Sequence, residues 1–199
     1  DPSVATDLGA LLNHADWAVR LTGVRILGNL GLESSIRPLS ARLTDGNREV
    51  RLQAVQSLHQ MKAQSAHAEV VKALRDADLK VQTAAIDFLV EMGTAETVPH
   101  LLHVLKDESE FARRAAVEVL NAVATPEAIG DLIRVLRDED WWVRVRAADA
   151  LGSLGGERVV DAVVGLLDGD EEFLRRFAVE ILIMVPHERA VPALSHALR

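Results

Sequence analysis

Residues that could ligate a metal or act in catalysis are few in this sequence, and their spacing suits neither task. His100 and His103 lie three residues apart, which puts both imidazoles on one face of a helix, but such a pair is far more often solvated than metal-bound. The chain has no cysteine, which excludes thiolate ligands, thiol nucleophiles and disulfides. It also lacks a glycine-rich phosphate loop and a serine, histidine and aspartate arrangement. We therefore predict no catalytic residues, no metal ligands and no cofactor.

The composition predicts a folded protein whose partners are neither nucleic acids nor membranes. Hydrophobic residues make up 49% of 199 residues, enough for a substantial core. The net charge of −8, from 30 acidic and 22 basic residues, disfavours non-specific binding to phosphate backbones. No apolar run approaches the roughly 18 residues needed to cross a bilayer. The absence of cysteine leaves the compartment open, and a cytoplasmic protein is the simplest expectation. The sequence begins DPSV without methionine, so it could be a piece of a longer chain.

The dominant feature of the chain is an internal repeat of 31 residues. Leucine marks the period without insertion or deletion, at Leu12, Leu43, Leu74, Leu105, Leu136, Leu167 and Leu198. An arginine column runs beside it through Arg20, Arg51, Arg113, Arg144 and Arg175, with Gln82 in the third repeat. The sequence is therefore one unit written six times, followed by half of a seventh.

Each repeat is predicted to form a short helix, a turn and a long helix. The long helices are expected to start after the capping positions Asp16, Asn47, Asp78, Ser109, Asp140 and Glu171, of which the first five are strong N-caps. They are expected to end at Gly31, Lys62, Gly93, Ala124, Gly155 and Pro186, with left-handed caps at the three glycines. The short helices are expected at 36–43, 98–105 and 129–136, with Pro38, Pro99 and Pro192 in first turns.

One repeat cannot bury its apolar face alone, so the repeats must stack. The predicted fold is all-α, a single α-solenoid domain over residues 1–199 made of six helix-turn-helix repeats and a terminal half repeat. The last segment, VPALSHALR, would either cap the sixth repeat or mark the place where a longer solenoid was cut, and its outer side could pair with another copy of the chain.

The repeat resembles a known family through the motif D-x-D-x-x-V-R-x-x-A-A-x-A-L-G-x-L-G, nearly complete from Asp138 to Gly155. It looks like the short HEAT-like repeat of phycobilisome-lyase-type proteins, and the likeness covers all six repeats. The resemblance implies that each Asp of the motif bonds the Arg of a neighbouring repeat, with Arg144 tied to a neighbour in this way. The aspartates of this column are Asp45, Asp76, Asp107 and Asp138. Gln82 replaces the arginine in the third repeat, and His14 and Gly169 stand at the aspartate position in the first and sixth repeats, so softer junctions are expected there.

The long helices carry a variable face, defined by six positions per repeat opposite the apolar arc. In HEAT-like solenoids the long helix lines the concave side, so the resemblance implies that this face lines an inner groove. Six of the seven aromatic residues fall there, namely Trp17, Phe111, Trp141, Trp142, Phe173 and Phe177, while Phe88 is predicted to be in the core. Burial should draw aromatic rings away from such a face.

Rings interleaved with Arg114, Arg146 and Arg176 have the composition of a protein-binding hot spot. Packing of the rings on neighbouring turns is the alternative. An acidic column, Asp87, Glu118, Asp149 and Glu180, would either select a basic partner or pair with the nearby arginines. The predicted partner-binding residues are Trp17, Phe111, Arg114, Trp141, Trp142, Arg146, Asp149, Phe173, Arg176 and Phe177.

The function these residues favour is a non-catalytic scaffold that holds a partner protein in its concave groove. The alternative, suggested by the family resemblance, is a bilin lyase-like or chromophore-binding protein whose arginines hold the propionates of a tetrapyrrole. Trp141, Trp142 and Asp149 also faintly resemble HEAT-like DNA glycosylases, although the basic face is missing. His187–Glu188 resembles the His-Glu pairs of deoxyhypusine hydroxylase but occurs once, in a turn, so no di-iron site is predicted.

Overall fold

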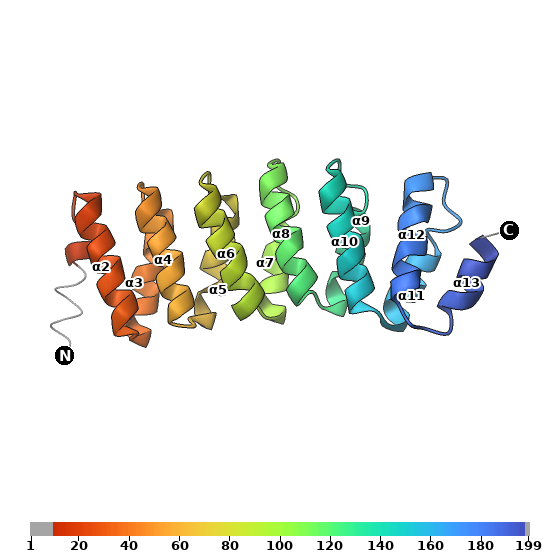
Figure 1. Ribbon diagram of the computed structural model, residues 1–199, viewed down its shortest axis with the longest axis horizontal. Coiled ribbons are helices and arrows are strands. Elements are labelled where there is room, and N and C mark those ends of the chain that lie inside the picture. Colours follow the sequence, from red (N-terminus) through yellow and green to blue (C-terminus); the bar gives the residue numbers. More distant parts are fainter. Residues whose placement is uncertain (1–9, 198–199) are drawn as a thin grey trace. The chain divides into compact units, whose positions relative to one another are not determined.

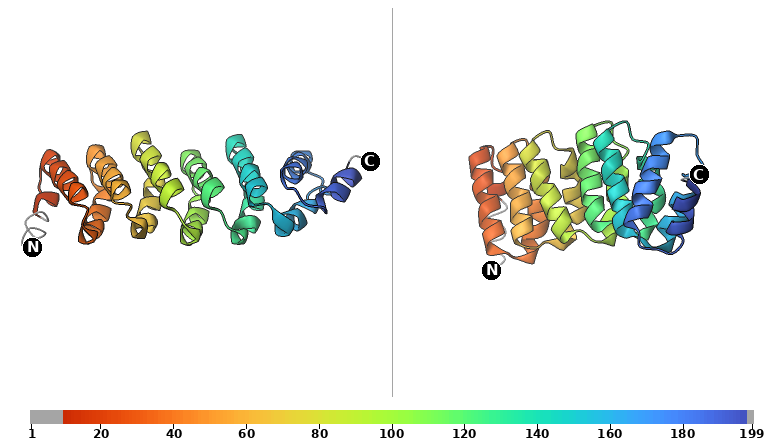
Figure 2. Two further views of the ribbon diagram at one scale, coloured as in Figure 1. Left: turned by 60° about the horizontal axis from the view of Figure 1, so that its bottom comes forward. Right: turned by 45° about the vertical axis from the view of Figure 1, so that its right-hand side comes forward.

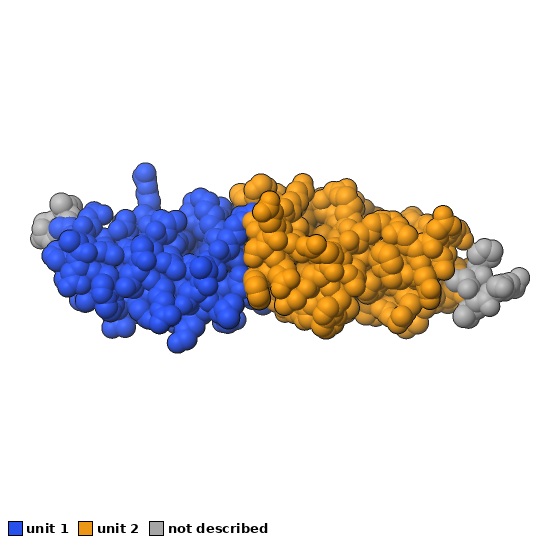
Figure 3. Space-filling model, turned by 90° about the horizontal axis from the view of Figure 1, so that it is seen from above, with its two compact units in different colours: residues 1–97 blue, residues 98–199 orange. Residues whose placement is uncertain are grey.

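The computed structural model describes residues 10–197, in which every regular element is a helix or a 3₁₀ turn. The all-α prediction is therefore confirmed. The chain divides into two compact units, residues 1–97 and residues 98–199, which Figure 3 shows in blue and orange. Each unit is treated by itself below, and the single domain expected over 1–199 stays a prediction. No helix of residues 10–197 is both long and apolar enough to span a membrane.

Long and short helices alternate along the chain (Figure 1). The long helices are α2 (Trp17–Leu30), α4 (Arg48–Gln60) and α6 (Leu79–Met92) in the first unit, and α8 (Glu110–Val123), α10 (Trp141–Leu154) and α12 (Glu172–Met184) in the second. The short helices are α3 (Ile36–Ser40) and α5 (His67–Val70), then α7 (Val98–Val104), α9 (Ile129–Val135), α11 (Gly156–Val164) and α13 (Ala190–Ala197).

Within each unit the helices form two layers, with the long helices in one row and the short helices in the other (Figures 1 and 2). In the second unit α10 packs between α8 and α12, and each long helix also packs on the short helix of its own repeat. In the first unit α4 lies between α2 and α6 in the same way. This stack of helix pairs is the arrangement of an α-solenoid.

The long helices begin where the capping residues predict. Each of the six predicted positions is the N-cap, and the side chains of Asp16, Asn47, Asp78 and Asp140 accept a hydrogen bond from an amide of the first turn. Ser109 is the exception among the strong caps, because its hydroxyl makes no capping bond.

Two of the predicted helix ends are one residue late, because α4 ends at a cap on Met61 and α12 at one on Val185. Lys62 follows in a left-handed conformation with φ of 52°. Gly31 has the expected left-handed cap, with φ of 64°. Gly93 does not, since its φ of −66° and ψ of 150° are those of extended backbone. The short helix expected over 36–43 also divides into α3 and a 3₁₀ turn over Ala41–Thr44.

The leucine column and the apolar arcs of the long helices form the core. The six column leucines from Leu12 to Leu167 are all buried, while Leu198 lies outside the described residues. Phe88 is 0% exposed, as predicted for the aromatic residue outside the variable face. Pro38, Pro99 and Pro192 lie in the first turns of α3, α7 and α13, where a missing N–H removes no helical hydrogen bond.

Arginine and aspartate join consecutive repeats as the resemblance implied. Arg20 holds both carboxylate oxygens of Asp45, at 2.7 and 2.8 Å, and Arg51 holds Asp76 in the same way. In the second unit Arg113 holds Asp138. The expected tie of Arg144 to a neighbouring repeat is wrong. Gly169 stands at the corresponding aspartate position, and Arg144 instead donates to the carbonyls of Asp138 and Glu139 in its own repeat.

Candidate functional site

The most exposed aromatic rings of the second unit lie at the starts of its three long helices. Phe111 on α8, Trp141 on α10 and Phe173 on α12 expose 54%, 63% and 42% of their surface. Each is the first or second residue of its helix, so the repeat places all three at the same end of the long-helix layer. Trp17, on α2 of the first unit, is 44% exposed, but it belongs to a different compact unit.

The two remaining predicted rings, Trp142 and Phe177, are half-buried. The guanidinium of Arg146 lies over the Trp142 ring, 5.7 Å from its centroid, and covers one face of the indole. The contact with Arg146 therefore accounts for part of the burial of Trp142. The adjacent tryptophans therefore differ, because Trp141 extends into solvent while Trp142 is partly covered by Arg146.

Arg114 joins a ring to a helix cap. Its Nε and Nη2 donate to Oδ1 and Oδ2 of Asp140 at 3.2 and 2.5 Å, and its guanidinium lies 5.8 Å from the centre of the Phe111 ring. Asp140 also accepts from the amide of Val143, so one carboxylate caps α10 and ties that helix to α8. The hydrogen bonds from Arg114 lower the pKa of Asp140 to about 2.

Arg146 forms a second network on the same face. It donates to both carboxylate oxygens of Glu118 on α8, at 2.8 and 2.9 Å, and to Asp149 on its own helix at 2.9 Å. Hydrogen bonding to Glu118 is the main cause of the raised pKa of Arg146. The acidic column was expected either to select a basic partner or to pair with nearby arginines. Glu118 and Asp149 pair with an arginine.

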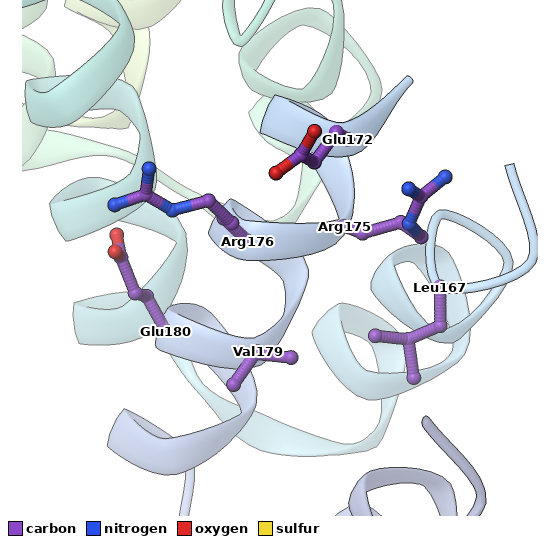
Figure 4. Close-up of a pocket in the computed structure, with 6 residues that line it drawn as sticks. All are labelled: Leu167, Glu172, Arg175, Arg176, Val179 and Glu180. Carbon is purple, nitrogen blue, oxygen red and sulfur yellow. The ribbon is translucent and has the colours of Figure 1, made fainter. Parts of the chain in front are cut away.

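Arg176 differs from the other two arginines of the face, since it has no ion pair or hydrogen bond with another described residue. Together with Arg175 it lines a cavity of about 330 Å³, completed by Leu167, Glu172, Val179 and Glu180. Figure 4 shows Arg176 and Glu180 on one side of α12 and Arg175 extending from the other side, that of Leu167.

The contacts of two residues near the face were not predicted from the sequence. Asp140 was assigned as a helix cap alone, although it also anchors Arg114. Arg175 was assigned to the structural ladder, although the part of the chain that the structure describes supplies no carboxylate for it.

The histidines form no metal site in the described part of the chain. His100 and His103 are exposed on α7, and no group of three or more histidine, cysteine or acidic side chains lies close enough to hold an ion among residues 10–197. His187 lies in the turn before α13, where its ring nitrogen accepts from the amide of Arg189.

Solved structures of similar fold span almost the whole chain. The complex of CpcE and CpcF of phycocyanin lyase from Nostoc sp. PCC7120 has a TM-score of 0.52 and 22% identity, covering 94% of this chain and 79% of that one. An archaeal HEAT-like repeat protein from Thermococcus onnurineus NA1 has a TM-score of 0.54 and 15% identity, over 97% and 87%. A microtubule polymerase with tumor overexpressed gene domain arrays has a TM-score of 0.71 and 14% identity, over 88% and 45%. At these identities the likeness shows the fold alone.

Sequence comparison gives the family. No curated protein matches the sequence significantly. The family model for HEAT repeats matches residues 36–121 and again residues 99–183, so the two matches together cover more than half of the chain. This chain belongs to the HEAT-repeat proteins.

Proposed function

We propose that the chain is a non-catalytic interaction module that binds a partner protein on the long-helix face of its second unit, in the groove that the family resemblance implies. The observation that carries the proposal is the set of three exposed rings, Phe111, Trp141 and Phe173, at equivalent ends of three consecutive long helices. Burying one such ring contributes about 1.5–3 kcal/mol. Aromatic and arginine side chains are the residue types that dominate protein-binding hot spots.

Protein binding is also what the names of two structural neighbours describe. The microtubule polymerase recruits tubulin, and CpcE and CpcF form a complex with one another. These facts belong to those proteins, but they support a partner protein as the class of ligand for this fold.

The ion pairs of the face support a protein partner over a phosphate or propionate ligand. Arg114 is held by Asp140, and Arg146 by Glu118 and Asp149, so neither guanidinium is free to bind an added anion. Both arginines also lie against rings, which fixes the surface before binding and lowers the entropy lost on association.

The proposal is tested with the double variant Phe111→Ala/Trp141→Ala in a capture experiment from the source cell, with isolated partners identified and titrated back. We expect loss of the specific partner with an unchanged melting temperature, because exposed side chains contribute little to stability. The matched control is Leu79→Ala, which removes a side chain that is 66% exposed at the start of α6. Retained capture, or a melting temperature lowered by several degrees, would show that the rings serve packing instead.

A tetrapyrrole remains the second candidate ligand, because the cavity beside α12 places Arg175 and Arg176 in a lining with apolar Leu167 and Val179. At about 330 Å³ it lies near the lower end of small-molecule sites, which makes this candidate the weaker one. Titration with biliverdin decides it. A shift of the visible absorption band that Arg175→Gln/Arg176→Gln abolishes would support a bilin site, and an unchanged spectrum would remove it.

A further inference from the structure

Two exposed rings and a valine form an apolar patch on α8 and α10, which we define as Phe111, Trp141 and Val145. Val145 lies one helical turn after Trp141 and exposes 37% of its surface. Arg114 connects the two rings, because its guanidinium lies over Phe111 and binds Asp140, the residue before Trp141. Since α10 packs between α8 and α12, the exposure of Trp141 and Val145 does not arise at an end of the helix row. A contiguous exposed apolar patch with a polar rim is typical of an interaction site.

Negative charge surrounds the apolar patch, because three guanidiniums beside it are each shared by two carboxylates, at distances of 3.8 Å or less. The sets are Arg113 with Asp138 and Glu139, Arg114 with Asp140 and Glu110, and Arg146 with Glu118 and Asp149. Six carboxylates therefore share three positive charges, which leaves an excess of three negative charges. Glu108 and Arg144, in the same turns, cancel one another.

The excess charge at the helix starts lies on exposed glutamates. Asp138 and Asp140 are nearly buried, with side-chain exposures of 11% and 7%, whereas Glu139 and Glu110 expose 82% and 49%. Each glutamate stands within two residues of an exposed ring in the sequence. A cationic side chain bound at either glutamate would therefore lie close to a ring of the apolar patch.

The rings of this face already bind cations from the chain itself. Arg114 lies 5.8 Å from the centre of the Phe111 ring, and Arg146 lies 5.7 Å from that of Trp142. Such contacts are attractive because the face of an aromatic ring carries negative partial charge. Trp141 is the most exposed of the rings, and no cation among residues 10–197 lies over it. It therefore presents an open ring face next to the exposed carboxylate of Glu139.

We propose that the apolar patch binds a basic segment of a partner protein. A lysine or arginine of that segment stacks on Trp141 and pairs with Glu139, while an apolar neighbour covers Val145 and Phe111. The inference rests on the proposed function and specifies the chemistry of the partner. An acidic or phosphate-bearing partner is disfavoured, because it would bring further negative charge to a surface that already has an excess.

The test is selection from a random dodecapeptide library, displayed on phage, against three forms of the full chain. These are wild type, Glu110→Gln/Glu139→Gln, and the matched control Glu127→Gln/Glu157→Gln. The control removes two charges from exposed positions before α9 and on α11 of the same unit. We expect wild type and control to enrich the same peptides, in which lysine or arginine stands beside an apolar residue. Glu110→Gln/Glu139→Gln should not enrich them.

Titration of the most enriched peptide, labelled with fluorescein, then gives the size of the effect. We expect its Kd to rise at least about fivefold in Glu110→Gln/Glu139→Gln and to stay unchanged in the control, because two exposed ion pairs are lost only in the first. Higher salt should weaken binding to wild type, since it screens these pairs. Phe111→Ala/Trp141→Ala should lose the peptide. Circular dichroism verifies that each variant is folded.

Three outcomes would overturn the basic partner. They are enriched peptides without a basic residue, basic peptides that bind Glu110→Gln/Glu139→Gln as tightly as wild type, and a selection that enriches nothing. The proposed function is judged separately, by capture of the cellular partner. A partner that is lost in Phe111→Ala/Trp141→Ala but kept in Glu110→Gln/Glu139→Gln would support the aromatic face and remove only its preference for basic segments.

Discussion

Arg113 and Asp138 lie 25 residues apart and form a two-pronged ion pair between α8 and the turn before α10, with N–O distances of 2.9 and 3.1 Å. Both side chains are largely removed from water, at 6% and 11% exposure. The same aspartate accepts from the amide of Asp140 at 2.9 Å, which shapes the turn. The Asp138 carboxylate therefore binds Arg113 of the preceding repeat and also orders the turn from which α10 begins.

Removing one member of this pair should destabilise the second unit strongly. Arg113→Ala leaves the Asp138 carboxylate desolvated without its partner, and losses for such changes are about 3–5 kcal/mol. Urea unfolding of the full chain, followed by circular dichroism, measures the effect.

The matched control is Arg144→Ala in the same column, where Gly169 replaces the aspartate and the guanidinium has only carbonyl acceptors among residues 10–197. Here we expect a loss of about 1 kcal/mol. Equal losses for the two variants would show that the inter-repeat carboxylate contributes nothing beyond the backbone bonds.

Acid should weaken the contact between α8 and α10 through Asp140. The folded-state pKa of Asp140 is lowered from 3.8 to about 2, chiefly by the hydrogen bonds from Arg114. A lowered folded pKa adds stability that is complete above pH 4 and is lost as pH falls toward 2. Asp45 and Asp78, whose pKa values are also lowered, make the stability of the first unit fall with acid in the same way.

Asp140→Asn isolates this contribution, because asparagine still caps a helix but has no carboxylate to protonate. We expect the variant to be less stable than wild type at pH 6 and to lose less stability between pH 4 and pH 2. Parallel acid dependence of the two melting temperatures would contradict the assignment to Asp140.

Two glycines within helices should respond to alanine in opposite directions. A Cβ on Gly28 of α2 would lie 2.4 Å from the Oγ and 2.6 Å from the Cβ of Ser57 on α4, closer than non-bonded carbon atoms can approach, so the two helices would have to shift. Gly28→Ala should therefore cost about 1–3 kcal/mol through overpacking. Gly130 on α9 has nothing within 4 Å of such a Cβ, so Gly130→Ala should stabilise by about 0.5–1 kcal/mol. Thermal melts of both variants check the two signs.

The repeat period and the capping residues predicted much of the fold, because both act within a few residues of the chain. Asp16, Asn47, Asp78 and Asp140 cap helices through bonds to amides two or three residues away. The end of α4 was less predictable, since Lys62 takes a left-handed conformation that its residue type does not signal.

The site was predictable as a set of rings but not as a set of contacts. Helical periodicity places Phe111, Trp141 and Phe173 on the variable face, and their exposure agrees with it. The partners of Arg114 and Arg146 depend on the distance between α8 and α10, which no local pattern encodes. The hydrogen bonds from Arg25 to Gln53 and from Arg146 to Glu118 both join residues 28 positions apart. In the first the arginine is the earlier residue, and in the second it is the later one. The column spacing therefore shows where such contacts recur.

The adjacent tryptophans should differ in their access to solvent. Trp141 is 63% exposed, whereas Trp142 is half-buried beneath the Arg146 guanidinium. Acrylamide quenching of the fluorescence should fall more in Trp141→Phe than in Trp142→Phe, with Trp17 contributing equally to both. In Glu118→Gln, Arg146 loses its carboxylate partner on α8 and covers the indole less firmly, so quenching of Trp142 should rise when measured in the Trp141→Phe background. Equal quenching of the two single variants would mean that Arg146 does not shield Trp142 in solution, and would contradict the difference in solvent exposure between the two rings.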